Sequence, residues 1–168
     1  MSRKDADAEF DEFVDASWSR LRWTAYMLTG DGHLAEDLAQ TALVRTYASW
    51  SRVRRDDALA YARKVLVNAN IDRLRRRHIT EVSDEGLERA YPARESSTDD
   101  RDELVRLLAG LTDRERRVLV LRHYYDLPEN AVAGELGISI GTVKSTASRA
   151  LAKLRSAEPA PAVARGVG

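Results

Sequence analysis

The stretch from Pro128 to Arg155 constrains this chain most, because it predicts two helices joined by a tight turn. Ala133, Gly137 and Val143 follow the spacing A-x3-G-x5-V. A small residue is needed where two helices cross closely, glycine supplies the positive φ of a short turn, and valine fills the angle between the helices. We therefore predict a helix-turn-helix, with Ser139 as the N-cap of its second helix.

The second of these helices is basic and rich in hydroxyl groups, and it carries no acid as far as Arg155. Cationic groups bind phosphates, and hydroxyl and cationic groups both reach base edges. The pattern therefore predicts a recognition helix that binds DNA. Its bases are Lys144, Arg149, Lys153 and Arg155, beside Thr142, Ser145 and Ser148.

Length and composition limit the alternatives. The 168 residues allow one domain, or two of about 70–80 residues each. Without cysteine, neither a disulfide nor a thiolate zinc site can form. The polar, acidic N-terminus and the lack of an apolar run of about 18 residues predict a cytoplasmic protein with no signal peptide and no membrane insertion.

The net charge of zero hides strong patterning. Residues 5–15 hold six acids and no base, residues 52–78 hold nine bases and three acids, and residues 81–103 hold nine acids and three bases. Two basic segments on either side of an acidic one indicate two nucleic-acid contacts. The alternative for residues 52–78 is an ordinary solvated helix face.

Apolar residues recur at steps of three and four along most of the chain, and no alternating β-branched run predicts a strand. We expect an all-α fold of two small helical domains. Residues 5–78 form the first domain, of three to four helices, 79–101 a flexible acidic linker, 102–157 the helix-turn-helix domain and 158–168 a disordered tail. In the second domain, Thr112–Glu115 (T-D-R-E) predicts a capping box, and Pro128 suits a first helical turn.

Four motifs resemble the extracytoplasmic-function (ECF) sigma factors, the two-domain class of the sigma-70 family, and most of all their actinobacterial sigma-E-like subgroup. The resemblance covers residues 8–156. It implies a promoter-specificity subunit of RNA polymerase that recognises −10 and −35 promoter elements, with no cofactor and no catalysis of its own. The motifs are L-T-G-D-G-H-L-A-E-D-L-A-Q-T-A-L-V-R (Leu28–Arg45), A-Y-A-R-K-V-L-V-N-A-N-I-D-R-L-R-R-R (Ala60–Arg77), L-T-D-R-E-R-R-V-L-V-L-R (Leu111–Arg122) and the helix-turn-helix.

The resemblance assigns the A-E-D-L-A-Q block, in the domain similar to sigma region 2, to docking on a coiled coil of the largest catalytic subunit of core RNA polymerase. It also implies a contact with the flap region of the polymerase. Glu36, Asp37, Gln40 and Leu43 can share one exposed helical stripe, with Asp37 as the best single candidate. The alternative is an acidic cluster favoured by the helix macrodipole.

The Val67–Arg77 block matches the segment that recognises and opens the −10 element in this family. By the same resemblance, the loop from Ser51 to Asp57 is expected to form a pocket that traps an unstacked base. Extruding a base from the stack costs a few kcal/mol, which such a pocket must offset. Trp50 and Tyr61 could stack on bases, but both fit core positions, and Trp50 is favoured as core. The matching positions are Asn68, Asp72, Arg73, Arg75 and Arg76.

The second domain resembles sigma region 4, the −35 reader, and the resemblance aims its recognition helix at the major groove. An arginine or lysine bidentate to guanine discriminates by about 1–3 kcal/mol. Ala131 stands where many members carry an acid, so the −35 preference cannot be taken from relatives. The residues expected at the groove are Thr142, Lys144, Ser145, Ser148 and Arg149. An anti-sigma factor remains an open further partner.

Two other functions compete with the sigma-factor interpretation. A helix-turn-helix regulator would bind an operator as a dimer, without polymerase. An enzyme is disfavoured because no glycine-rich phosphate loop and no nucleophile beside a base is found, and His33, His78 and His123 lack ligand spacing. His33 lies near two acids, but a histidine at a helix start is favoured over a metal ligand.

Overall fold

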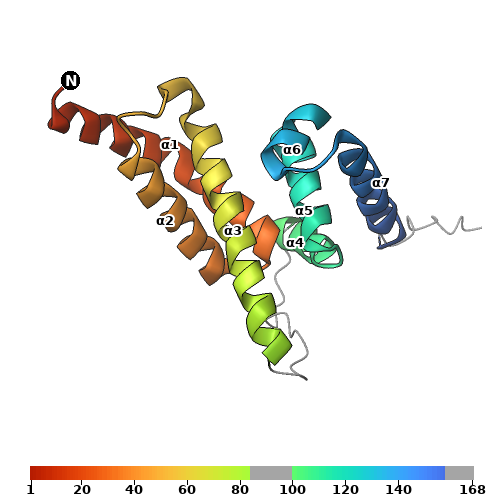
Figure 1. The fold of residues 1–168 in the computed structure, drawn as a ribbon. Coiled ribbons are helices and arrows are strands. Elements are labelled where there is room, and N and C mark those ends of the chain that lie inside the picture. Colours follow the sequence, from red (N-terminus) through yellow and green to blue (C-terminus); the bar gives the residue numbers. More distant parts are fainter. Residues whose placement is uncertain (84–99, 158–168) are drawn as a thin grey trace, which may run out of the picture. The chain divides into compact units, whose positions relative to one another are not determined.

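The structure is a computed structural model that describes residues 1–83 and 100–157 (Figure 1). The chain divides into two compact units, Met1–Ser97 and Thr98–Gly168. Within the described residues the secondary structure is entirely helical, with no strand, which confirms the expected all-α class.

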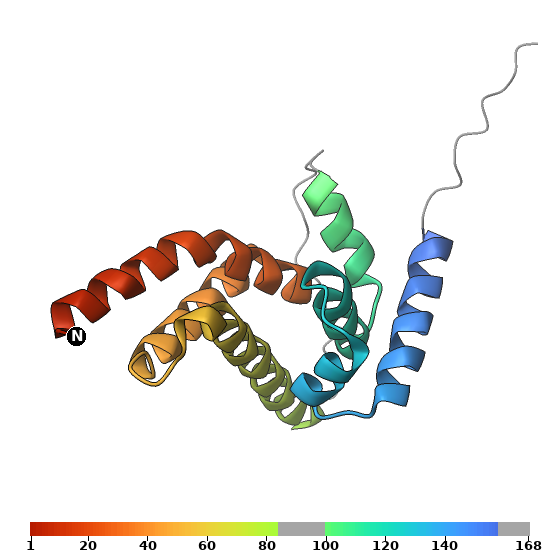
Figure 2. The ribbon, with the colours of Figure 1, turned by 90° about the horizontal axis from the view of Figure 1, so that it is seen from above.

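The first unit consists of three long helices, α1 (Arg3–Thr29), α2 (Gly32–Ala48) and α3 (Ala58–Ser83), which pack on one another (Figures 1 and 2). Small side chains let the helix backbones approach closely, because alanine adds little bulk at a contact. Leu21 and Leu66 fill the remaining space and are fully buried. The alanines with no exposed surface are Ala25, Ala35, Ala39, Ala42 and Ala62.

Local chemistry sets the ends of these helices. Ser2 and Asp5 form a capping box at the start of α1. Gly30 ends α1 with a φ of 69°, a left-handed conformation that glycine adopts at little cost. The Asp31 side chain then accepts hydrogen bonds from the backbone N–H groups of His33 and Leu34 at the start of α2.

The connection from α2 to α3 has a small core of its own. Trp50, Val53 and Ala58 are buried there, with Phe10 and Phe13 of α1 packed against them. The chain then passes through one 3₁₀ turn, η1 (Arg55–Asp57), into α3. The core position of Trp50, which is 4% exposed, agrees with the expectation from the sequence.

The second unit contains α4 (Asp100–Ala109), α5 (Asp113–Leu119), the π-helical segment η2 (Val120–Tyr124), α6 (Glu129–Leu136) and α7 (Ile140–Ala157). The predicted helix-turn-helix is α6 and α7. Its spacing works as expected, because Gly137 has a φ of 66° and Val143 is completely buried. The Ser139 hydroxyl accepts from Thr142 N–H at 3.1 Å. One core cluster of the unit consists of Val118, Leu121, Val132, Ala133 and Val143.

Two helices extend past the expected domain boundaries, which stay predictions. α3 continues to Ser83, five residues into the expected linker, because no glycine or proline occurs between Ala58 and Ser83 to stop it. α4 begins at Asp100 rather than Asp102. Pro128 is the N-cap of α6 and lies just before its first turn. The rest of the linker, residues 84–99, and the tail, residues 158–168, lie outside the described residues.

Candidate functional site

One exposed stripe runs along α2. Asp37 and Gln40 lie on it as predicted, and with Thr41 and Val44 they recur at steps of three and four residues. These side chains, together with Arg45, line an open pocket of about 380 Å³. Glu36 is also exposed, but it forms an ion pair with Arg22, with Nε and Oε1 3.2 Å apart.

Leu43 does not belong to this stripe, which corrects the prediction. It is 7% exposed and packs into the core of the first unit. The apolar residue on the stripe is Val44, which is 68% exposed. Leu43 and Val44 are adjacent in α2, so their side chains point in different directions. Val44 lies seven residues, or about two turns, from Asp37 and therefore on the same side of the helix. The sequence alone did not separate the two residues, because Leu43 stands at the same spacing of seven residues from Glu36.

The α3 residues expected at the −10 element lie mostly on the surface. Asn68, Asp72, Arg75 and Arg76 are exposed and follow one face of the helix, at spacings of four, seven and eight residues from Asn68. Arg73 is half-buried, and its Nε and Nη2 donate to the Asn70 side-chain carbonyl at 3.2 and 3.1 Å. Arg73 is therefore tied to the helix that carries it.

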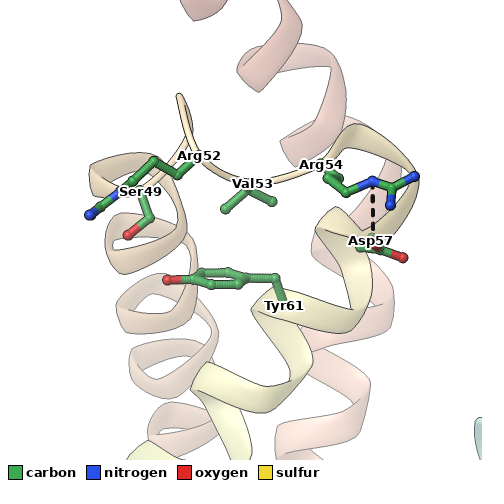
Figure 3. A pocket seen from close by; sticks show the side chains of 6 residues that line it. All are labelled: Ser49, Arg52, Val53, Arg54, Asp57 and Tyr61. Atoms are coloured by element: carbon green, nitrogen blue, oxygen red, sulfur yellow. Dashed lines mark ion pairs between the residues drawn. The ribbon is translucent and has the colours of Figure 1, made fainter.

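A second open pocket, of about 480 Å³, lies where α2 passes into α3 (Figure 3). Figure 3 shows Val53 and the ring of Tyr61 at its centre, with Arg52 and Arg54 on opposite sides. The loop predicted to trap a base therefore does form a pocket, and Tyr61 rather than Trp50 lines it. The lining residues are Ser49, Arg52, Val53, Arg54, Asp57 and Tyr61.

Helix α7, which the sequence predicts as a recognition helix, presents most of the expected residues away from its buried Val143 and Ala150. Lys144, Ser145, Ser148 and Arg149 are exposed, and Thr142 is half-buried. The Ser139 hydroxyl lies 2.8 Å from the Thr142 hydroxyl, and the Lys144 ammonium lies 3.7 Å from a Glu129 carboxylate oxygen. The exposed groups combine hydrogen-bonding hydroxyls with two cations.

Lys153 is not available as the free cation that the sequence suggested. Its ammonium donates to Glu115 Oε1 at 2.5 Å, and the Glu115 side chain is 4% exposed. Glu115 also accepts from Thr112 N–H in the capping box of α5. Burial works to raise the pKa of the Glu115 carboxyl, but these hydrogen bonds hold that pKa below its ordinary value.

Among the residues that the structure describes, no three side chains from His, Asp and Glu come together as a metal site. His33 is exposed in the first turn of α2, beside the Asp31 cap, as expected for a helix-start histidine. None of the helices in the described ranges is long and apolar enough to cross a lipid bilayer.

Comparison with known proteins identifies both units. The family description "Sigma-70 region 2" matches residues 13–79, and "Sigma-70, region 4" matches residues 101–154. The RNA polymerase sigma-E factor of Streptomyces avermitilis is 41% identical over 152 residues, which cover 88% of this chain and 83% of that protein. The chain belongs to the sigma-70 family of RNA polymerase sigma factors.

Further relatives place this sigma factor among the ECF class. The ECF RNA polymerase sigma factor SigW of Bacillus subtilis is 28% identical over 173 residues, covering 92% of this chain and 91% of SigW. The sigma factor RpoE of Bartonella quintana, solved in complex with the anti-sigma factor NepR, superposes with a TM-score of 0.69 at 25% identity, covering 88% and 94% of the two chains. Sigma factors partner with core RNA polymerase and promoter DNA, and this one directs promoter-specific transcription.

Proposed function

We propose that the sigma factor divides its work among three surfaces: the α2 stripe binds core polymerase, α3 and the 480 Å³ pocket bind the melted −10 element, and α7 reads the −35 element. The observation that supports this assignment is that α2, α3 and α7 each expose most of their expected side chains, and that the loop before α3 forms an open pocket. The chain carries out no chemistry itself and acts in the cytoplasm as a subunit of the polymerase.

The α2 stripe suits a protein partner. It offers the carboxylate of Asp37 and the amide of Gln40 beside the exposed Val44. A carboxylate can pair with an arginine of the partner while an apolar side chain enters a shallow groove. We assign the stripe to the coiled coil of the largest catalytic subunit of core polymerase.

The pocket beside α3 suits an extruded base. Its volume of about 480 Å³ falls within the usual range of small-ligand sites, roughly 300–1,000 Å³. The Tyr61 ring offers a stacking surface, and stacking on an aromatic ring contributes about 1–3 kcal/mol per base. Exposed arginines on α3 supply phosphate contacts on the same unit, so a single strand could be held by its backbone and by one base.

A reconstitution tests the whole proposal. The purified chain is mixed with core polymerase that lacks any other sigma factor, and co-elution and transcription from a genomic promoter pool are measured. We expect co-elution and defined start sites. Failure to associate with core polymerase, together with tight sequence-specific binding to duplex DNA by the chain alone, would favour a dimeric regulator and contradict the assignment of the first unit.

A substitution on the α2 stripe tests the docking surface directly. Asp37→Arg replaces an attractive charge with a repulsive one, and we expect at least a roughly 30-fold loss of affinity for core polymerase, as for an interface hot spot. The matched control is Asp11→Arg, which makes the same change at an exposed acid of α1. Wild-type affinity of Asp37→Arg, or equal losses in both variants, would refute the docking assignment.

A further inference from the structure

Three arginines lie in or beside the loop that forms the pocket, and they are in different environments. Arg52 and Arg54 are exposed, and the Arg54 side chain is 77% accessible with only surface contacts to Asp56 and Asp57. The Arg55 side chain is less accessible, at 35%, and its guanidinium is hydrogen-bonded to the loop backbone and to Glu9. The sequence R-V-R-R gives no hint of this difference, because all three would serve equally well as phosphate contacts.

The Arg55 guanidinium holds the backbone of the loop. Its Nη1 donates to two carbonyl oxygens, those of Trp50 and Val53, each at 2.8 Å. Its central carbon lies 3.9 Å from the centre of the Trp50 ring, which is a cation–π contact. The two carbonyls bracket residues 51–53, so this one side chain fixes the segment that presents Arg52 and Val53 to the pocket.

Helix α1 holds the guanidinium in turn. Arg55 Nε donates to Glu9 Oε2 at 2.7 Å, a contact between residues 46 apart in sequence. Two aromatic residues of α1 near Glu9 also pack against the loop, because the centres of the Phe10 and Phe13 rings lie 5.1 and 5.3 Å from the centre of the Trp50 ring. The planar guanidinium has a fixed fork of donors, so one carboxylate at Nε also sets the direction in which Nη1 points.

We propose that Arg55, oriented by Glu9, is a positioning residue that fixes the shape of the base-binding pocket and thereby its discrimination among bases, and that it is not a phosphate contact. This inference rests on the proposed function of the pocket. A pocket wall that is already ordered rejects a wrong base by steric clash and unpaired polar groups, whereas a loose wall adapts to it. Each lost hydrogen bond is expected to reduce discrimination roughly two- to tenfold.

The test uses polymerase carrying this sigma factor and short single strands with the −10 sequence obtained from the reconstitution. Each base is replaced in turn by the other three, and the dissociation constants are measured at several salt concentrations. For Arg55→Ala we expect the ratio between matched and mismatched bases to fall at the position where the wild type discriminates, with an unchanged salt slope. We expect the same of Glu9→Gln, to a smaller extent, and Arg55→Lys should fail to rescue because an ammonium cannot reproduce the fork.

Two matched variants separate positioning from charge and from general loosening of α1. Arg76→Ala removes an exposed cation of α3 that does not line the pocket, so the salt slope should fall by about 0.7 while the base ratio stays. Tyr47→Phe removes another bond between α1 and α2, in which the Tyr47 hydroxyl donates to Asp7 at 2.6 Å, and should retain the wild-type ratio.

Two results would overturn the inference in distinguishable ways. If Arg55→Ala keeps the base ratio and lowers the salt slope as Arg76→Ala does, Arg55 is a phosphate contact and only the positioning role fails. If the wild type discriminates at no position, the pocket does not bind a base, and the proposed function of the pocket fails with the inference. Co-elution of each variant with core polymerase reports that the first unit is folded.

Discussion

Single basic side chains in this protein have roles that their position in the sequence does not reveal. Lys153 lies on the recognition helix but is bound to Glu115, 38 residues earlier in the chain. Arg55 lies in a basic loop but is bound to Glu9 and to the loop backbone. In both cases a cation that looks suited to phosphate instead holds one helix against another part of its own unit.

Loss of the Lys153 ammonium should destabilise the second unit. In Lys153→Met the Glu115 carboxylate stays buried without its charged partner, and we expect a cost of about 2–3 kcal/mol. Hydrogen-exchange protection of α5 and α7 measures this cost. The control is Lys144→Met, whose ion pair with Glu129 is 3.7 Å long and solvent-exposed, and which should cost less than about 0.5 kcal/mol. Equal protection of the Lys153→Met variant and the wild type would show that the pair does not stabilise the fold.

The same carboxylate predicts a pH dependence. Hydrogen bonds from Lys153 and Thr112 outweigh burial and hold the pKa of Glu115 below its ordinary 4.5, so the folded state binds this proton less tightly than the unfolded state does. Its contribution is therefore complete above pH 4.5 and is lost as the pH falls through the lower folded pKa. The stability difference between wild type and Glu115→Gln, followed by hydrogen exchange in α5 and α7, should shrink over that range. A constant difference would contradict the prediction.

Helix α2 has one buried side and one exposed side, so an apolar residue on the first stabilises the fold and one on the second is available to bind a partner. Leu43→Ala should destabilise the first unit by about 2–5 kcal/mol, because Leu43 is only 7% exposed and its truncation leaves a cavity in the core. Val44→Ala should change stability by less than about 0.5 kcal/mol but weaken binding to core polymerase. Thermal unfolding and co-elution measure the two effects. Loss of polymerase binding in a Leu43→Ala protein that remains fully folded would restore Leu43 to the docking surface.

Features that depend on neighbours in sequence were predictable at the scale of helices. The Thr112–Glu115 capping box, the Ser139 cap and the positive φ of Gly137 each follow from chemistry within a few residues, and the structure confirms them. The α3 residues were placed by resemblance to the family, and all of them but Arg73 are exposed. The π-helical segment η2 was not predicted, since no local signal distinguishes it from an α-helix that continues from α5.

Features that depend on tertiary packing could not be predicted from the sequence. The side of α2 that α1 and α3 cover decides that Leu43 is buried and Val44 exposed. The bonds of Arg55 to Glu9 and of Lys153 to Glu115 join residues 46 and 38 positions apart, so no spacing rule finds them. The pocket beside Tyr61 also exists only once α2, the loop and α3 have come together.

At the scale of the whole molecule, the two units contain different core clusters, and the proposed function gives each unit its own task. Trp50, Val53 and Ala58 form one core cluster in the first unit, whereas Val118, Leu121 and Val143 belong to a cluster in the second. Because substitutions without shared partners act independently, a change on α7 should leave polymerase docking through α2 intact.

Arg149→Ala tests this separation at the −35 element. Arg149 is exposed on α7. Its Nη2 donates to the Thr146 hydroxyl over a long distance, 3.5 Å, so this weak contact leaves the guanidinium able to turn toward a base edge. Losing a bidentate contact with guanine should cost about 1–3 kcal/mol in the preference for the matched −35 sequence over a scrambled one. Co-elution with core polymerase should not change. Competitive transcription from the two templates measures the preference.

The control for Arg149 is Arg155, an exposed cation six residues further along α7. If Arg155 contacts only phosphate, Arg155→Ala should weaken matched and scrambled templates equally, because phosphates carry no direct sequence information. Together the two variants separate base reading from charge on one helix. Equal transcription from both templates by the wild type would show that α7 does not read the −35 sequence, and a loss of core binding in Arg149→Ala would show that the two units do not act separately.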